Sequence, residues 1–110
     1  MIDLGYYTRY SLDVEAETIE QAYSAIASLR RNSSSAEYAL DYAGNSGESC
    51  KWYNHEENLV DTSFMFPDVK FTLSGEGEEA GDIWKLYVIN GKTERVRAKV
   101  TFDESTLFGL

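Results

Sequence analysis

The spacing of hydrophobic side chains predicts a strand followed by a helix in the first third of the chain. From Tyr6 to Val14 every second residue is Tyr, Thr, Leu or Val, and most positions between them are polar. This repeat is typical of a strand with one buried face. Thr18 and Gln21 stand three residues apart and can form a capping box at the start of a helix, which we expect to end near Arg31. Its apolar positions recur at helical spacing, and they are Ile19, Ala22, Tyr23, Ile26 and Leu29.

Three further elements are expected in the middle of the chain. Alternation over residues 37–43 predicts a second strand. Apolar residues recur at helical spacing over residues 51–66 and predict a second helix, which Pro67 ends because proline cannot continue it. Alternation over residues 69–74 predicts a third strand, and the Gly-rich acidic loop 75–82 terminates it.

The remaining residues predict a hairpin for which two turns are conceivable. The pair Asn90-Gly91 favours a two-residue turn, which would set Trp84 opposite Arg97. A three-residue loop over 89–91 would instead set Trp84 opposite Val96. Because burial fixes strand register, we predict the three-residue loop, which gathers the apolar residues of both strands on one face. These residues are Trp84, Leu86, Val88, Val96, Ala98, Val100 and Phe102.

The order of these elements predicts the fold class. Strand, helix, strand, helix and three strands indicate an α+β, ferredoxin-like two-layer sandwich, with both helices on one face of a mainly antiparallel sheet. The chain has 110 residues, 43% of them hydrophobic, which is enough for one core. We therefore expect a single domain over residues 1–110.

Net charge and cysteine content narrow the class of protein. Nineteen acidic residues against ten Lys and Arg give a charge of −9, which opposes non-specific attraction to nucleic acids and anionic lipid. No apolar run reaches the roughly 18 residues of a membrane span. The single cysteine, Cys50, can form no internal disulfide. We expect a cytoplasmic protein without membrane contact.

Acidic residues concentrate on the predicted second helix and on the loop that follows the third strand. Such a surface can bind a basic groove of a partner protein, in place of a nucleic acid. Acidic residues also favour helix starts and solubility, which is the simpler explanation of the same pattern. The candidate partner-binding residues are Glu56, Glu57, Asp61, Glu76, Glu78, Glu79 and Asp82.

The predicted hairpin register places basic residues on the sheet face away from the helices. Six of the ten Lys and Arg residues would lie there beside two tyrosines, a combination that can contact phosphates and stack bases. A solvated sheet face also suits long basic side chains, and no RNA-binding strand motif is present. The candidate nucleic-acid-binding residues are Tyr7, Arg9, Lys85, Tyr87, Arg95, Arg97 and Lys99.

Residues suited to catalysis or metal binding are few. His55 is the only histidine, and no Gly-x-Ser-x-Gly motif supplies a serine nucleophile. Cys50, His55 and Glu56 have no spacing typical of a zinc site, and loop 75–82 fits neither a calcium loop nor a phosphate loop. We therefore expect no enzyme, metal or cofactor, and structural roles for Cys50 and His55.

Several short motifs resemble those of one protein family. They are Lys51-Trp52-Tyr53-Asn54-His55-Glu56-Glu57, Phe66-Pro67-Asp68-Val69, Gly75-Glu76-Gly77-Glu78-Glu79, Gly81-Asp82-Ile83-Trp84 and Asn90-Gly91-Lys92. Over residues 50–100 the chain resembles the small ferredoxin-like proteins of phages, plasmids and integrated elements, of the YubB-like kind. The resemblance implies a fold and an origin in a mobile element, and it transfers no catalytic residue.

The resemblance also implies a function for an acidic protein of this size. We expect a host-defence antagonist of the anti-CRISPR or anti-restriction type, which binds the basic groove of a CRISPR or restriction effector and blocks it without turnover. Trp52 or Tyr53 would anchor the contact if exposed. The alternative is a module that binds RNA or single-stranded nucleic acid through the sheet.

Overall fold

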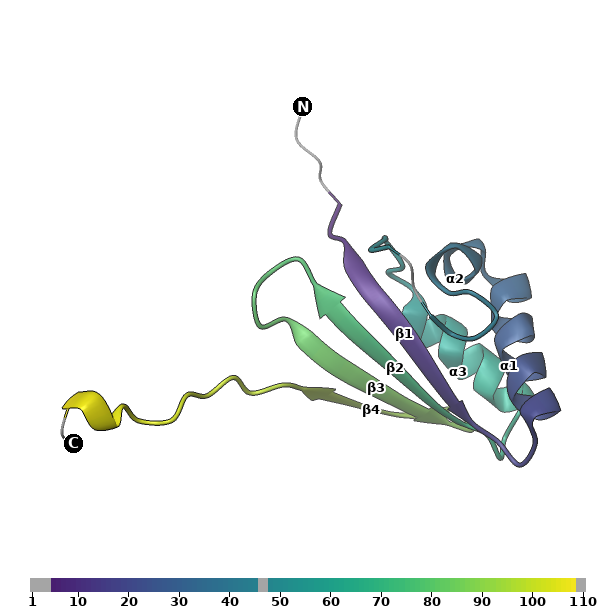
Figure 1. Cartoon of the computed structure of the whole chain (residues 1–110). Helices are drawn as coiled ribbons and strands as arrows, with labels where there is room; N and C mark the ends of the chain where they lie inside the picture. The colour runs from purple at the N-terminus through teal and green to yellow at the C-terminus, as the bar shows by residue number, and fades with distance from the viewer. Residues whose placement is uncertain (1–4, 46–47, 109–110) are drawn as a thin grey trace.

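The computed structural model describes residues 5–45 and 48–108, which form one four-stranded sheet covered by helices (Figure 1). This arrangement confirms the coarse prediction of an α+β fold with an antiparallel sheet. The elements are β1 (Thr8–Glu15), α1 (Ile19–Asn32), α2 (Ser34–Ala39), α3 (His55–Met65), β2 (Lys70–Gly77), β3 (Ile83–Ile89), β4 (Lys92–Arg97) and the 3-10 turn η1 (Thr106–Phe108). Among these helices none has the length and apolar character needed to cross a membrane.

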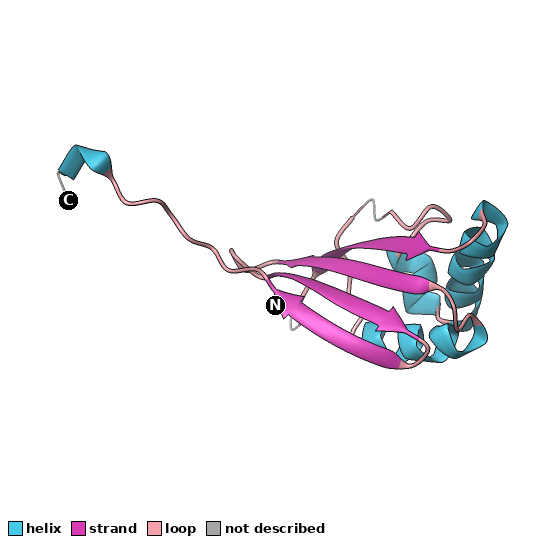
Figure 2. Ribbon diagram, turned by 90° about the horizontal axis from the view of Figure 1, so that it is seen from below, coloured by secondary structure: helices cyan, strands magenta, loops and turns pink. Residues whose placement is uncertain are grey.

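The sheet is a simple meander with strand order β1-β2-β3-β4, and every neighbouring pair is antiparallel. All three α-helices lie on one face of it (Figure 2). They are consecutive in the chain, between β1 and β2, so the predicted alternation of strand, helix, strand and helix is wrong. The opposite face of the sheet carries no covering element from the described residues.

The error in element order comes from the strand predicted over residues 37–43, where the structure has helix α2. The side-chain oxygen of Ser33 caps α2 by accepting a hydrogen bond from the Ala36 N–H at 3.1 Å. The buried positions follow helical spacing, and they are Ala36, Ala39 and Leu40. Tyr38 and Tyr42, which suggested the alternation of a strand, are both exposed.

Helix α1 begins and ends close to its predicted limits. The Thr18 hydroxyl accepts a hydrogen bond from the Gln21 N–H at 3.1 Å, as the capping box predicts. The Gln21 side-chain oxygen accepts from the Glu17 N–H at 3.2 Å, one residue before the position of an ideal box. At the other end, Arg30 Nε donates to the Leu40 carbonyl at 2.9 Å and ties α1 to the end of α2.

Helix α3 is shorter than predicted, because residues 51–54 precede it as a loop. Leu59, Thr62 and Ser63 form its buried side, whereas Phe64, expected beside the apolar stripe, is exposed. The core lies between the helices and the inner face of the sheet. Its large buried side chains include Tyr10, Leu12, Leu29, Trp52, Leu59, Phe71, Leu73, Trp84 and Leu86.

The β3–β4 hairpin has the two-residue turn, so the predicted three-residue loop is wrong. Asn90 and Gly91 have φ values of 44° and 78°, as a type I′ turn requires. Ile89 therefore pairs with Lys92 and Trp84 pairs with Arg97. Directly opposed residues share a face, so Arg95 and Arg97 lie on the helix-covered side of the sheet.

The apolar residues expected to face the core from the last strand are instead exposed. The exposed fraction is 48% for Val96, 63% for Val100 and 92% for Phe102. Ala98 N–H still donates to the Ile83 carbonyl at 2.8 Å. Beyond it the chain leaves the sheet and extends away from the body (Figures 1 and 2), which gives the described part extents of 56 × 42 × 22 Å.

Candidate functional site

The seven predicted partner-binding acids lie on three parts of the structure. Glu56 and Glu57 occupy the first turn of α3, and Asp61 follows Glu57 one turn later on the same side of the helix. Glu76 lies near the end of β2, opposite Arg9 of β1. The remaining acids, Glu78, Glu79 and Asp82, belong to the connection between β2 and β3.

This β2–β3 connection folds back on itself in a defined loop. The Gly77 N–H donates to the Asp82 carbonyl at 2.8 Å, and the Asp82 N–H donates to the Glu79 carbonyl at 3.1 Å. Gly81 has a φ of 83°, a conformation that glycine adopts without strain. At Gly77 a Cβ atom would lie 2.1 Å from Asp82 Oδ2 and 2.4 Å from the Tyr6 hydroxyl, so a larger residue there would displace the contact between these two side chains.

Tyr6 fastens this loop to the segment before β1. Its hydroxyl donates a hydrogen bond to Asp82 Oδ2 at 2.6 Å and accepts one from the Glu79 N–H at 3.2 Å. The bond to Asp82 is the main cause that raises the Tyr6 pKa. The Tyr6 N–H donates to the Tyr53 hydroxyl at 2.8 Å, so the loop and the residues before α3 meet at one tyrosine.

Glu78 is held in a similar way. Its Oε1 atom accepts a hydrogen bond from the Tyr7 N–H at 2.8 Å. The Tyr6 hydroxyl and the Tyr7 N–H, both in the segment before β1, thus hold the carboxylates of Asp82 and Glu78 in defined positions. The sequence predicts a Gly-rich acidic loop here, and it places Tyr6 only at the start of the first predicted strand.

Two arginines of strand β4 bind the loop and the start of α3. Arg97 Nη1 donates to Asp82 Oδ1 at 3.0 Å, and Arg95 Nη2 donates to Glu56 Oε1 at 3.1 Å. The two arginines are two residues apart and share the inner face of β4. The loop, the edge of the sheet and α3 therefore form one continuous surface. We call it the acidic end and define it as Tyr53, Glu56, Glu57, Glu78, Glu79 and Asp82.

The carboxylates of the acidic end differ in their availability. Glu56 and Asp82 are each paired with an arginine. Within the described part of the chain, the side chains of Glu57 and Glu79 make no ion pair, and both residues are exposed. Asp61 extends this surface along α3, whereas Glu76 points to the other face of the sheet and stands apart from it.

Of the two predicted aromatic anchors, only Tyr53 is available. Trp52 is fully buried, and its Nε1–H donates to Asn58 Oδ1 at 2.8 Å. Tyr53 is 62% exposed, and its hydroxyl is held by the Tyr6 N–H. The sequence predicts both neighbours within a helix over residues 51–66, whereas the structure places them in the loop before α3.

The sheet face away from the helices is not basic, contrary to the prediction. Arg95 and Arg97 lie on the inner side, and Lys99 follows the end of β4. Tyr7 precedes β1, with the Lys51 ammonium 5.1 Å from its ring centroid. Four basic and four acidic side chains point outward from the strands, so this face is balanced in charge. They are Arg9, Lys70, Lys85, Lys92, Asp13, Glu15, Glu76 and Glu94.

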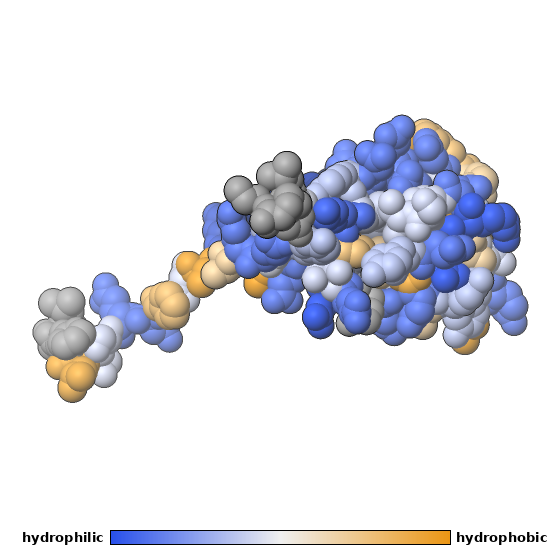
Figure 3. Space-filling view, turned by 90° about the horizontal axis from the view of Figure 1, so that it is seen from above, coloured by the Kyte–Doolittle hydropathy of each residue, from blue (hydrophilic) through white to orange (hydrophobic). Residues whose placement is uncertain are grey.

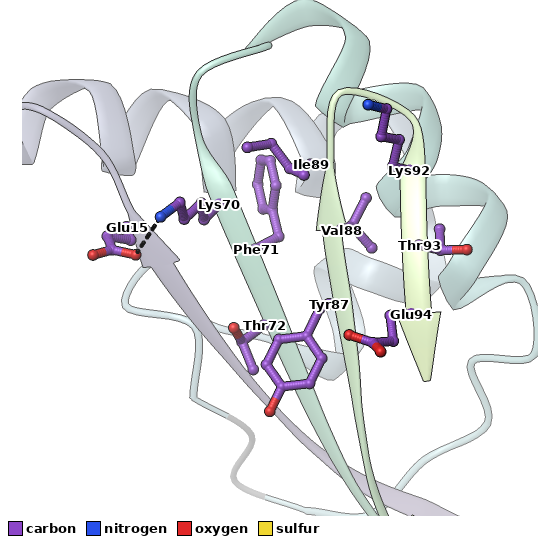
Figure 4. A pocket seen from close by; sticks show the side chains of 10 residues that line it. All are labelled: Glu15, Lys70, Phe71, Thr72, Tyr87, Val88, Ile89, Lys92, Thr93 and Glu94. Atoms are coloured by element: carbon purple, nitrogen blue, oxygen red, sulfur yellow. Dashed lines mark ion pairs between the residues drawn. The ribbon is translucent and has the colours of Figure 1, made fainter. Parts of the chain in front are cut away.

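A shallow hollow of about 430 Å³ lies on this open face beside Tyr87 (Figure 4). Its basic groups are Lys70 and Lys92, and its acidic groups are Glu15 and Glu94. Lys70 Nζ lies 4.0 Å from Glu15 Oε2 in an exposed ion pair. Because the charges balance, the hollow offers no concentrated site for a phosphate.

His55 belongs to an aromatic cluster that the sequence did not reveal. Its ring stacks on Trp84 with centroids 4.9 Å apart, and the Arg95 guanidinium lies 4.4 Å from a Trp84 ring centroid. His55 Nδ1 lies 2.8 Å from the Trp52 carbonyl, which can only accept a hydrogen bond. Nδ1 therefore carries the proton, and Nε2 accepts from Arg95 Nη2 at 2.9 Å.

The surroundings of His55 and Cys50 favour their uncharged forms. Burial is the main cause that lowers the His55 pKa, and the Arg95 charge adds to it. Burial also raises the pKa of the Cys50 thiol, whose backbone is paired with Thr8. The neutral imidazole and the protonated thiol are explained by packing. Among the described residues no group of three His, Cys, Asp or Glu side chains could hold a metal ion.

Comparisons with known proteins add no relative. No family model, no curated protein and no solved structure matches the chain. The resemblance to the YubB-like proteins therefore stays a prediction, and the functional argument depends on the chain's own geometry.

Proposed function

We propose that this protein is a non-catalytic binding inhibitor whose acidic end occupies a basic, nucleic-acid-binding groove of a partner protein. The observation that carries the proposal is the way the acidic loop is held. Hydrogen bonds to Tyr6, the Tyr7 N–H and Arg97 fix the carboxylates of Glu78 and Asp82. A loop that is already ordered loses less conformational entropy when it binds.

The charge distribution supports a basic partner. The whole chain carries −9, which accelerates encounter with a positively charged surface. At the acidic end Glu57 and Glu79 remain exposed without an ion pair in the described structure. These two carboxylates come from different elements, so they can contact a groove at two points.

Tyr53 supplies an apolar contact beside these charges. Tyrosine is enriched among residues that contribute most to protein interfaces, because it buries a large ring while keeping a polar hydroxyl. The Tyr53 side chain is fixed through the Tyr6 N–H. It therefore provides a rigid anchor between the loop and α3.

The kind of partner follows from the same proposal. A groove that accepts closely spaced carboxylates is one built for phosphates, as in an effector of CRISPR or restriction defence. A protein from a mobile element would act on such an effector in the host cytoplasm. Inhibition would need only occlusion of the groove, with no catalytic group, metal or cofactor.

Charge reversal at the acidic end tests this proposal. We expect Glu57→Lys combined with Glu79→Lys to weaken capture of the partner from host lysate by at least about tenfold, since two attractive contacts become repulsive. Capture by the unaltered protein should also fall as salt rises. The measurement is quantitative mass spectrometry of proteins retained by the tagged chain.

The matched control reverses two exposed acids elsewhere, Glu17→Lys with Glu37→Lys, and changes the net charge equally. The control should retain the partner. Thermal unfolding of both variants checks that they fold. Equal capture by the two variants would remove the acidic end from the mechanism.

A further inference from the structure

Residues 92–102 carry the pattern of a longer strand than the structure contains. Val96, Ala98, Val100 and Phe102 alternate with polar residues, as in a strand with one apolar face. Pairing with β3 ends at Arg97. The apolar side chains of the extension are exposed, which is visible as apolar positions along the projecting segment in Figure 3. Their pattern indicates a partner surface that a single copy does not supply.

Strand β4 is also the open edge of the sheet. It pairs with β3 on one side, and no described strand lies on its other side. The opposite edge, β1, is partly covered by bridges from Cys50 to Thr8 and from Asn45 to Ser11. An exposed edge strand with apolar side chains is a template for pairing with another chain.

The described extension, residues 98–108, does not cover this edge. Residues 98–108 continue from β4, so lying beside it would need a tight turn. None of the usual residues of such turns, Gly, Pro, Asn, Asp and Ser, occurs over 92–102. As an extended strand, 98–108 would span about 36 Å, and it projects away from the body in Figure 1. A second chain can therefore reach the whole segment.

We propose that residues 96–104 pair antiparallel with the same residues of a second copy, so that the extensions of the two sheets join in a two-stranded ribbon that begins at the last two residues of each β4. Such a contact is self-complementary and closes around a two-fold axis. When the axis passes through a residue, even-numbered residues lie opposite even-numbered residues of the second copy, and odd-numbered residues lie opposite odd-numbered ones. The apolar side chains of both copies then lie on one face.

The charges and the apolar contacts together select the position of the axis. An axis at Thr101 opposes no like charges, but it sets Ala98 opposite Glu104. An axis at Lys99 would set the two Lys99 side chains opposite each other, and an axis at Ala98 would set Arg97 opposite Lys99, both repulsive. An axis at Val100 opposes no like charges and sets Arg97 opposite Asp103. It also pairs Phe102 with Ala98 and Val100 with Val100, so every apolar side chain from 98 to 102 meets another.

Solution molar mass tests this dimer directly. Sedimentation equilibrium of the full chain at micromolar to millimolar concentration should give twice the mass of one 12.4 kDa chain. Val100→Glu should return the mass to that of one chain, because two carboxylates would meet at the axis. Tyr38→Glu places the same charge at another exposed hydrophobic side chain, on α2, and should leave the dimer intact.

A cysteine at the axis provides a second readout. Opposed residues of an antiparallel pair bring their Cβ atoms to about 4.5–5.5 Å, close enough for a disulfide after small adjustments. In a Cys50→Ser background, Val100→Cys should give a linked dimer under mild oxidation, and Lys85→Cys should not. A single-chain mass throughout the concentration range, or loss of the dimer in Tyr38→Glu as well, would overturn the proposal. So would a dimer that survives Val100→Glu.

Discussion

Trp84 lies at the centre of a group of side chains on the inner side of the sheet edge. His55 stacks on one part of the ring, Arg95 lies 4.4 Å from a ring centroid, and Tyr10 meets it edge-on at 6.2 Å. Gly75 lies opposite it on β2, where a Cβ atom would come within 2.2 Å of the ring. The ring is buried although an arginine faces it, because a guanidinium can stack on an aromatic surface. Burial of Trp84 therefore did not require an apolar residue on β4.

The neutral state of His55 has a consequence for stability at the same scale. Its folded pKa is lowered by burial and by Arg95, so the unfolded chain binds the proton more readily. The stabilising contribution is complete above the unfolded pKa of about 6.5 and is lost as pH falls through that value toward the folded pKa.

We expect the difference in unfolding free energy between the unaltered protein and His55→Gln to shrink as pH falls from 7 to 5. Glutamine retains hydrogen-bonding atoms without titrating in this range. Chemical denaturation at a series of pH values measures the difference. A difference that stays constant across this range would contradict the half-buried, neutral imidazole.

At the scale of elements, local signals predicted most of the secondary structure. The cap at Thr18, the proline at 67 and the alternation in β1 and β3 each act within a few residues, and the structure agrees with them. Helix α2 was missed because its cap, Ser33, lies in a run of serines that resembled a loop. Two exposed tyrosines then imitated the alternation of a strand.

The hairpin register depended on contacts that are distant in the sequence. The pair Asn90-Gly91 favoured the two-residue turn that the structure has. We predicted the three-residue loop because it would have placed the apolar residues of both strands on one face. Arg95 reaches His55 and Glu56, some 40 residues earlier in the chain, and no local pattern reveals that pairing. The wrong register also led to the prediction of a basic sheet face. In the observed register Arg95 and Arg97 point to the helix-covered side, so the candidate nucleic-acid-binding residues do not share one face.

Replacement of Arg95 tests the observed register. We expect Arg95→Ala to raise the His55 pKa, because it removes a neighbouring positive charge and exposes the imidazole. NMR titration can follow this directly, since His55 is the only histidine. Lys85→Ala on the opposite face of the sheet should leave the titration unchanged. An unaltered His55 pKa in Arg95→Ala would contradict the two-residue turn.

At the scale of the whole molecule, the sequence indicated which acidic residues lie near one another. It did not indicate the hydrogen bonds that hold their carboxylates in place. Glu56, Glu57, Glu78, Glu79 and Asp82 do form one surface. The structure adds Tyr6 and Arg97, which fix that surface by hydrogen bonds between residues 76 and 15 positions apart in the sequence. The sequence assigned Arg97 to nucleic-acid binding and gave Tyr6 no role at this surface, because the contacts of both residues exist only once β4, the loop and the segment before β1 are assembled.

Competition with nucleic acid tests the proposed function most directly. The partner captured by the protein is purified, and its binding to nucleic acid is titrated at several fixed concentrations of the unaltered chain. Occlusion of the groove predicts that the nucleic-acid concentration for half-saturation rises in proportion to the added protein, and that Glu57→Lys with Glu79→Lys abolishes this rise. Nucleic-acid binding that is unaffected by the bound protein would contradict the account.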